Sequence, residues 1–202
     1  MALLVGKAQS SPGAWLAETS LPIAVQEVAV AHLNGLVYLT GGDTSQGRSQ
    51  ALYAYDPSTR VWTSRAPYPG TARDHVGIAA AAQSLYILGG IVAWPAPAVS
   101  TVQRYDVVAN TWTEVAPLPL PRGSMAVAPI NGKIYAAGGL RDGAAVSDFT
   151  VYDPAANVWQ TLPPLPTARD HAVGVALNGK LYVIGGRPGS DAICAPVKTV
   201  EV

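Results

Sequence analysis

The chain has one cysteine and few charged residues, and each scarcity excludes a class of protein. Cys194 cannot form an intrachain disulfide and fits a reducing compartment, so we expect a cytoplasmic protein. Charged residues make up 13 % of the chain and the formal net charge is zero, so bulk charge directs it neither to nucleic acid nor to an anionic membrane. No apolar run approaches the roughly 18 residues that cross a bilayer. Residues 1–13 carry too short an apolar run for a signal-peptide core and are expected to form a flexible tail.

Glycine, by contrast, is frequent, and its pairs recur in register. The four Gly-Gly pairs follow one another at steps of 48, 49 and 47 residues, at 41–42, 89–90, 138–139 and 185–186. A tyrosine stands three residues before each pair and a tryptophan 26 or 27 residues before it: Tyr38, Tyr86, Tyr135 and Tyr182; Trp15, Trp62, Trp112 and Trp159. A recurrence near fifty residues is typical of a propeller array, whose units must stack to bury their apolar faces.

Each unit is expected to form four antiparallel strands. In the third unit we predict them at 124–130, 133–137, 148–152 and 159–162. Asn131-Gly132 joins the first two, because these residue types accept the positive φ values of a tight hairpin. No helical periodicity is present, so the fold class is all-β, with each tryptophan a core residue between adjacent sheets.

The pattern resembles the kelch repeat, which has paired glycines, a Tyr-Asp turn and a tryptophan seven residues after that tyrosine, as at Tyr105, Asp106 and Trp112. The resemblance covers the chain from Trp15 to its last residue. It implies a β-propeller, most often of six or seven blades, that binds other proteins without catalysis.

The two ends of the chain are expected to share one blade. Trp15 begins as a fourth strand without preceding partners, and residues 197–202 resemble a third strand that stops before its Tyr-Asp turn. We predict a propeller over residues 14–202 with three whole blades and a fourth completed when the Trp15 strand pairs with the C-terminal strands, covering both open edges. A closed four-blade monomer is favoured. The alternatives are part of a larger propeller and half of a ring formed by two copies.

Function is expected on the face that carries the inter-blade linkers and the loops between second and third strands, because these segments vary while the opposite turns repeat. Three linkers carry an arginine 16 residues before the glycine pair, and the first carries Val25 instead. Two linkers continue as Asp-His, and one loop holds the tryptophan that lies outside the repeat register, a candidate partner anchor. The candidate binding residues are therefore Arg73, Asp74, His75, Trp94, Arg122, Arg169, Asp170 and His171.

Two interpretations of the arginines stay open. In kelch domains that grip acidic peptides, arginines at the matching place bind carboxylates, and the resemblance implies this for Arg73, Arg122 and Arg169. Alternatively, each arginine pairs with Asp74 or Asp170 and staples the blades, which is the interpretation we favour.

These residues predict a binding scaffold for a protein or acidic peptide, with a small anionic ligand also compatible, and with no cofactor and no catalytic residue. The enzyme alternative is a sugar-acid mutarotase of kelch type, which would use Arg73, His75, Arg169 and His171 at the channel mouth. A copper-radical oxidase is rejected, because it needs a Tyr–Cys crosslink and Cys194 lies outside that context. A third alternative is a propeller fragment without an intact site. In a four-blade ring the two Asp-His pairs would stand opposite each other and could approach a metal ion, but neither spacing nor a ligand-rich motif supports a metal site, and none is predicted.

Overall fold

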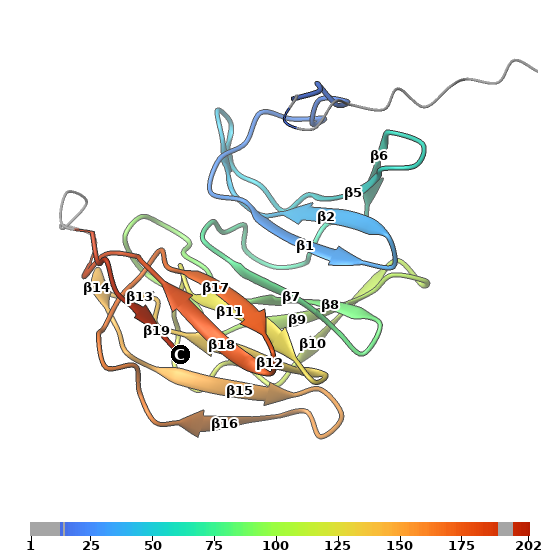
Figure 1. Cartoon of the computed structure of the whole chain (residues 1–202). Coiled ribbons are helices and arrows are strands. Elements are labelled where there is room, and N and C mark those ends of the chain that lie inside the picture. The colour runs from blue at the N-terminus through green and yellow to red at the C-terminus, as the bar shows by residue number, and fades with distance from the viewer. Residues whose placement is uncertain (1–12, 14, 190–195) are drawn as a thin grey trace, which may run out of the picture.

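The computed structural model describes Gly13, residues 15–189 and residues 196–202, and these residues contain strands and no helix. Four antiparallel sheets follow one another as the blades of a β-propeller, as predicted (Figure 1). Blade 1 comprises β1 (Ala29–Leu33), β2 (Leu36–Thr40), β5 (Leu52–Asp56) and β6 (Val61–Arg65). Blade 2 comprises β7 (Gly77–Ala81), β8 (Ser84–Leu88), β9 (Val102–Asp106) and β10 (Thr111–Val115).

Blade 3 repeats this order, and the described part of blade 4 has three strands. Blade 3 comprises β11 (Ala126–Ile130), β12 (Lys133–Ala137), β15 (Phe149–Asp153) and β16 (Val158–Leu162). Blade 4 comprises β17 (Val173–Leu177), β18 (Lys180–Ile184) and β19 (Val200–Glu201). Short ribbons extend the loops after the second strands of blades 1 and 3, namely β3 (Asp43–Thr44), β4 (Gly47–Arg48), β13 (Leu140–Arg141) and β14 (Ala144–Ala145). The described residues include no helix long and apolar enough to cross a membrane.

The glycine pairs let each linker approach the blade before it. Gly89 follows β8 with a φ of +54°, and a Cβ placed there would lie 2.1 Å from the carbonyl oxygen of Arg122 in the linker to blade 3. Gly138 stands in the same relation to the carbonyl of Arg169, at 2.4 Å. No larger residue fits these positions without moving the linker, which explains the periodic glycines.

A set of hydrogen bonds, here called the clasp, joins blade 2 and blade 3 each to the linker before it. Trp112 of β10 donates its indole N–H to the carbonyl of Ala66 at 2.8 Å, and the amide of Ala66 donates to the Asn110 side chain at 2.9 Å. Tyr105 donates its hydroxyl to the same Asn110 oxygen at 2.6 Å. Blade 3 repeats the clasp with Trp159, Ala116, Asn157 and Tyr152. The seven-residue spacing from tyrosine to tryptophan therefore places both side chains in the same clasp.

The predicted pairing of Trp15 with the C-terminal strands is not formed. The Trp15 side chain is 99 % exposed, and β19 pairs with β18 alone in blade 4. The segment after Trp15 instead lies against blade 1, where Trp62 donates its indole N–H to the carbonyl of Thr19 at 3.1 Å. Thr19 thus takes the place that Ala66 takes in the clasp of blade 2, and this contact holds the N-terminal segment at blade 1. Apart from Gly13, the tail predicted at residues 1–13 lies outside the described residues.

The side of blade 4 that faces away from blade 3 is open. Gly174 of β17 lies against the backbone of β11, where a Cβ would meet the amide nitrogen of Val127 at 2.9 Å. The alternating residues Val173, Val175 and Leu177 point the other way and are exposed. The inner strands therefore stack in the order β1, β7, β11 and β17, and the outer face of β17 carries no partner blade within the described chain.

Candidate functional site

Four equivalent linker positions, one from each blade, gather around the propeller axis. They lie two residues after Val25, Arg73, Arg122 and Arg169, and they are Glu27, His75, Ser124 and His171. Their φ values are +54°, +52°, +53° and +53°, in the left-handed region that residues with a side chain rarely adopt. Such strain costs of the order of 1 kcal/mol or more per residue and persists only where the surrounding fold imposes it. Here the same linker turn is imposed four times.

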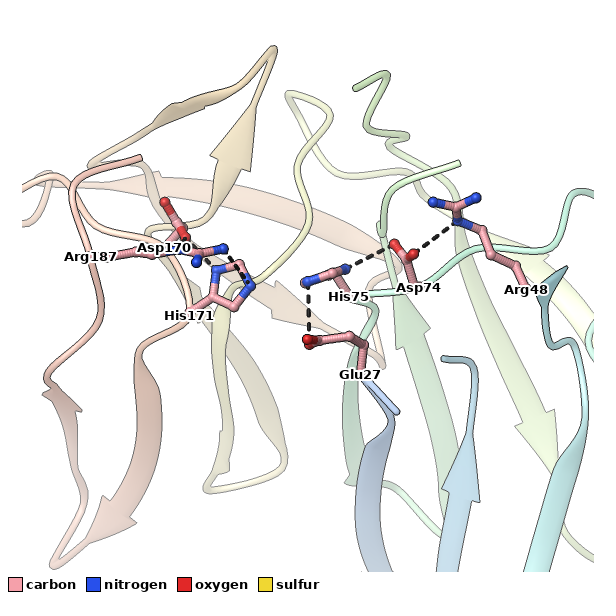
Figure 2. Close-up of polar contacts among 7 residues, drawn as sticks. All are labelled: Glu27, Arg48, Asp74, His75, Asp170, His171 and Arg187. Carbon is pink, nitrogen blue, oxygen red and sulfur yellow. Dashed lines mark hydrogen bonds and ion pairs between the residues drawn. The ribbon is translucent and has the colours of Figure 1, made fainter. Parts of the chain in front are cut away.

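Each axial histidine is held by the aspartate that precedes it in the linker (Figure 2). The His75 Nδ1 lies 2.9 Å from a carboxylate oxygen of Asp74, whose other oxygen lies 2.9 Å from the Nε of Arg48. On the other side of the axis, the His171 Nδ1 contacts Asp170, whose carboxylate also accepts from the Nε of Arg187 at 3.0 Å.

Both aspartates are buried, and an ionised carboxylate can only accept hydrogen bonds. Both imidazoles must therefore donate from Nδ1, so Nε2 is the ring atom left to other partners.

An aromatic residue covers the two histidines. The rings of His75 and His171 meet edge to face with their centroids 4.8 Å apart. Trp94 stacks on His75 at 4.9 Å and meets His171 edge-on at 5.8 Å, while the guanidinium of Arg187 lies 5.4 Å from the Trp94 ring centre. Trp94 remains 42 % exposed.

Two cavities meet at these residues. A cavity of about 300 Å³ is lined by Arg48, Trp94 and Arg187 together with Glu27 and both histidines. A second, of about 180 Å³, is lined by the same Glu27 and histidines and by Val28, Val76, Ser124, Met125 and Ala172. Glu27, His75 and His171 thus border both spaces, whereas Trp94 borders only the first. We call the first space the axial pocket.

The three repeat arginines lie inside the blades and not in this pocket. Arg122 is 1 % exposed and donates to the carbonyls of Gly138, Asp148 and Ala136 at 3.0, 2.7 and 3.2 Å, and to the Thr150 hydroxyl at 2.5 Å. Burial lowers the pKa of Arg122 to about 10. This guanidinium ties the linker of blade 3 to the second and third strands of its own blade.

Arg73 and Arg169 make the equivalent connection in blades 2 and 4. Arg73 donates to the Gln103 side chain at 2.9 Å, and burial lowers its pKa. Arg169 donates to Thr199 and forms an ion pair with Glu201 at 2.5 Å. The three acceptors occupy the same position in the third strands of blades 2, 3 and 4: Gln103, Thr150 and Glu201. The same arginine contact is therefore repeated in three blades.

The structure therefore brings together five of the eight candidate residues: Asp74, His75, Trp94, Asp170 and His171. The arginines that pair with the aspartates are Arg48 and Arg187, which the sequence did not single out. Glu27 was missed as well. It lies two residues after Val25, just as His75 and His171 lie two residues after Arg73 and Arg169, so the repeat could have identified it. The sequence marks Arg187 less clearly, only by its place directly after the fourth glycine pair.

Comparison with known proteins places this architecture in a family. A model for the KLHDC2/KLHL20/DRC7 Kelch-repeats domain matches residues 16–186. The chain belongs to the kelch-repeat family, as the glycine, tyrosine and tryptophan register predicted.

Similar sequences are kelch proteins of mammals and poxviruses. Kelch-like protein 35 of Mus musculus is 31 % identical over 126 residues, which are 62 % of this chain and 21 % of that protein. Kelch repeat and BTB domain-containing protein 1 of cowpox virus is 33 % identical over 116 residues, or 57 % of this chain and 21 % of its relative. Kelch domain-containing protein 10 of Rattus norvegicus is 34 % identical over 104 residues, which are 48 % of this chain and 25 % of that protein. The matched region spans about a fifth to a quarter of these relatives.

A solved structure shares the fold. The structure of YjhT superposes with a TM-score of 0.76 at 17 % sequence identity, covering 89 % of this chain and 66 % of that one. At this identity the likeness concerns the fold alone.

Proposed function

We propose that this chain is a non-catalytic binding scaffold that recognises a protein partner through the linker and loop face, with the axial pocket at the centre of the contact. The observation that carries the proposal is Trp94, which is 42 % exposed and stacked on residues from two other loops at the rim of that pocket. Tryptophan and arginine are the residue types most enriched at the energetic centres of protein interfaces. The names of the relatives, which are kelch proteins, agree with a binding role.

The rigidity of the rim supports recognition of a short segment. Trp94 packs against His75, and both histidines are fixed by buried aspartates, so little side-chain freedom remains to be lost on binding. An indole beside a guanidinium offers an apolar surface next to a donor for carboxylate. We therefore propose a peptide that carries an acidic residue beside an apolar one, with the acidic group at Arg187 and the apolar group on Trp94.

Panning a random-peptide phage library against the chain tests this function. We expect enrichment of peptides with an acidic residue next to an aromatic or aliphatic one. Their affinity should fall at least about tenfold in Trp94→Ala, the usual effect of truncating an interface anchor. His32→Ala is the matched control, because His32 is exposed on β1 at the opposite end of the strand from the linker. Selected peptides that bind Trp94→Ala and wild type equally well would contradict the proposal.

A sugar-acid mutarotase is the second candidate, and one observation favours it. Two Asp-His pairs face a single cavity, and an imidazole positioned by a carboxylate is a suitable general acid or base. In this reaction one histidine would take the proton of the anomeric hydroxyl while the other protonates the ring oxygen. Proton NMR of freshly dissolved sialic acid tests this function. If the chain is a mutarotase, the wild type would speed exchange between the anomers and the His171→Ala variant would not. Anomer exchange at the uncatalysed rate in the presence of wild type would exclude the function.

A further inference from the structure

We propose that Glu27, His75 and His171 form a binding site for a divalent transition-metal ion of the Zn²⁺ class. One ligand atom from each residue lies within 4.8 Å of the other two. The three come from the linkers of blades 1, 2 and 4, and Figure 2 shows their side chains pointing toward one another across the axis. Two imidazoles and one carboxylate are a ligand set that suits zinc and related ions.

The aspartates give the histidines the form that metal binding requires. A histidine that ligates a metal through one ring nitrogen usually donates the other N–H to a carboxylate, which fixes the tautomer and orients the ring. Asp74 and Asp170 accept from Nδ1 of His75 and His171, so Nε2 is the nitrogen through which each ring would bind an ion. Repetition of this arrangement in two blades places two such histidines at the same two cavities.

His75 and Glu27 stand close enough to bind one ion together. The Nε2 of His75 lies 3.3 Å from a carboxylate oxygen of Glu27, while Nδ1 of the same ring already donates to Asp74. A carboxylate oxygen and an imidazole nitrogen are both ligand atoms for zinc-class ions. Two ligands of a tetrahedral ion with bonds of 2.0–2.1 Å stand about 3.3 Å apart, which is the separation of this pair.

Charge around the axis also favours a cation. Four carboxylates and two guanidiniums lie around the axial pocket, which leaves two negative charges when the histidines are neutral: Glu27, Asp43, Asp74 and Asp170 against Arg48 and Arg187. Arg187 competes for the site, because its NH2 lies 3.1 Å from the Nε2 of His171. Its Nε remains bound to Asp170, so the terminal nitrogen can withdraw without breaking the ion pair.

The fourth equivalent position supplies a further oxygen. Ser124 shares the φ of the three ligands and lines the second cavity with them. Its buried hydroxyl oxygen has no hydrogen-bond partner among the described residues. An unpartnered hydroxyl beside two imidazoles and a carboxylate fits the approach of a metal ion or its bound water.

Calorimetric titration of the chain with Zn²⁺, paired with the visible spectrum of the Co²⁺ form, tests the site. We expect one ion per chain. Affinity should fall at least about 100-fold in His75→Ala and in His171→Ala, and about tenfold or more in Glu27→Gln, since loss of even an outer partner costs 10–100-fold. Arg187→Gln should tighten binding, because it removes the competing donor.

Two controls make the result decisive. His32→Ala removes the only other histidine of the sequence, and Cys194→Ser removes its only thiol, so both should bind Zn²⁺ as wild type does. Circular dichroism of each variant separates loss of ligand from loss of fold. Equal Zn²⁺ affinity in wild type and the His75→Ala/His171→Ala double variant would overturn the proposal. Weaker binding in either control would also overturn it, because the ligand set would then be different.

Discussion

Truncating Arg122 to alanine should destabilise the fold and leave the axial pocket intact. The substitution removes the guanidinium donor from three buried carbonyls. The Gly138 carbonyl loses its donor, while Asp148 still accepts from the Gly138 amide and Ala136 from the Thr150 hydroxyl. Each unsatisfied buried acceptor costs about 1–3 kcal/mol, while removal of the desolvated charge returns part of that. We expect a net loss of about 3–5 kcal/mol, the range found when one partner of a buried charged network is removed.

Urea unfolding followed by tryptophan fluorescence measures this loss. With a slope of about 2 kcal/mol per molar urea, the midpoint should fall by roughly 1.5–2.5 M. Arg122→Lys should lose most of the same stability, because an ammonium group cannot span acceptors that a planar guanidinium reaches together. The exposed Arg104 of β9 is the control, and Arg104→Ala should change stability by less than about 0.5 kcal/mol. An Arg122→Ala protein within about 1 kcal/mol of wild type would refute the structural role of the arginines.

Two further predictions concern the glycine pairs and the acidic turns. Gly89→Ala should lower the free energy of unfolding in urea by several kcal/mol, because its Cβ would collide with the Arg122 carbonyl. Gly132→Ala is the control, since Gly132 also has a positive φ but open space around it, and it should cost about 1 kcal/mol. Equal costs would contradict the close approach of the linker to Gly89. Backbone hydrogen bonds from Ala109 and Val108 lower the pKa of Asp106, so its contribution to stability is complete above the ordinary carboxyl pKa and is lost as pH falls through the lowered one. Thermal melts from about pH 5 to pH 2 should therefore show a smaller loss of stability in Asp106→Asn than in wild type, and parallel curves would contradict this.

The local pattern of the sequence was sufficient to predict the blades. Strand positions and hairpin turns follow from residue types a few positions apart, and the glycine register marks where a linker meets the preceding blade, as at Gly89. The clasp at Trp112 joins parts of neighbouring repeats, yet it recurs at fixed spacing and so remains visible in one sequence. Ring closure was not predictable in this way. It depends on the rotation between successive blades, which no local motif encodes, and the prediction for Trp15 was wrong for that reason.

The candidate site was predicted less completely than the fold. The repeat spacing identified Arg122 but could not predict where its side chain points. The side chain points into its own blade, because Thr150 and three carbonyls there accept hydrogen bonds from it. The partners Arg48 and Arg187 lie on loops whose conformation depends on tertiary contacts. The axial position of His75 and His171, by contrast, follows from the repeat, because equivalent residues of successive blades occupy equivalent places around one axis.

The repeat tryptophans hold the blades, and Trp94 is the residue that we propose contacts the partner. A ¹⁵N NMR spectrum of the indole N–H groups, recorded before and after addition of a selected peptide, tests both roles together. We predict that the indoles of Trp62, Trp112 and Trp159, which donate to linker carbonyls, exchange slowly with solvent and keep their shifts. The Trp94 signal should move on binding. Peptide binding that shifts a clasp indole and leaves Trp94 unchanged would contradict the account.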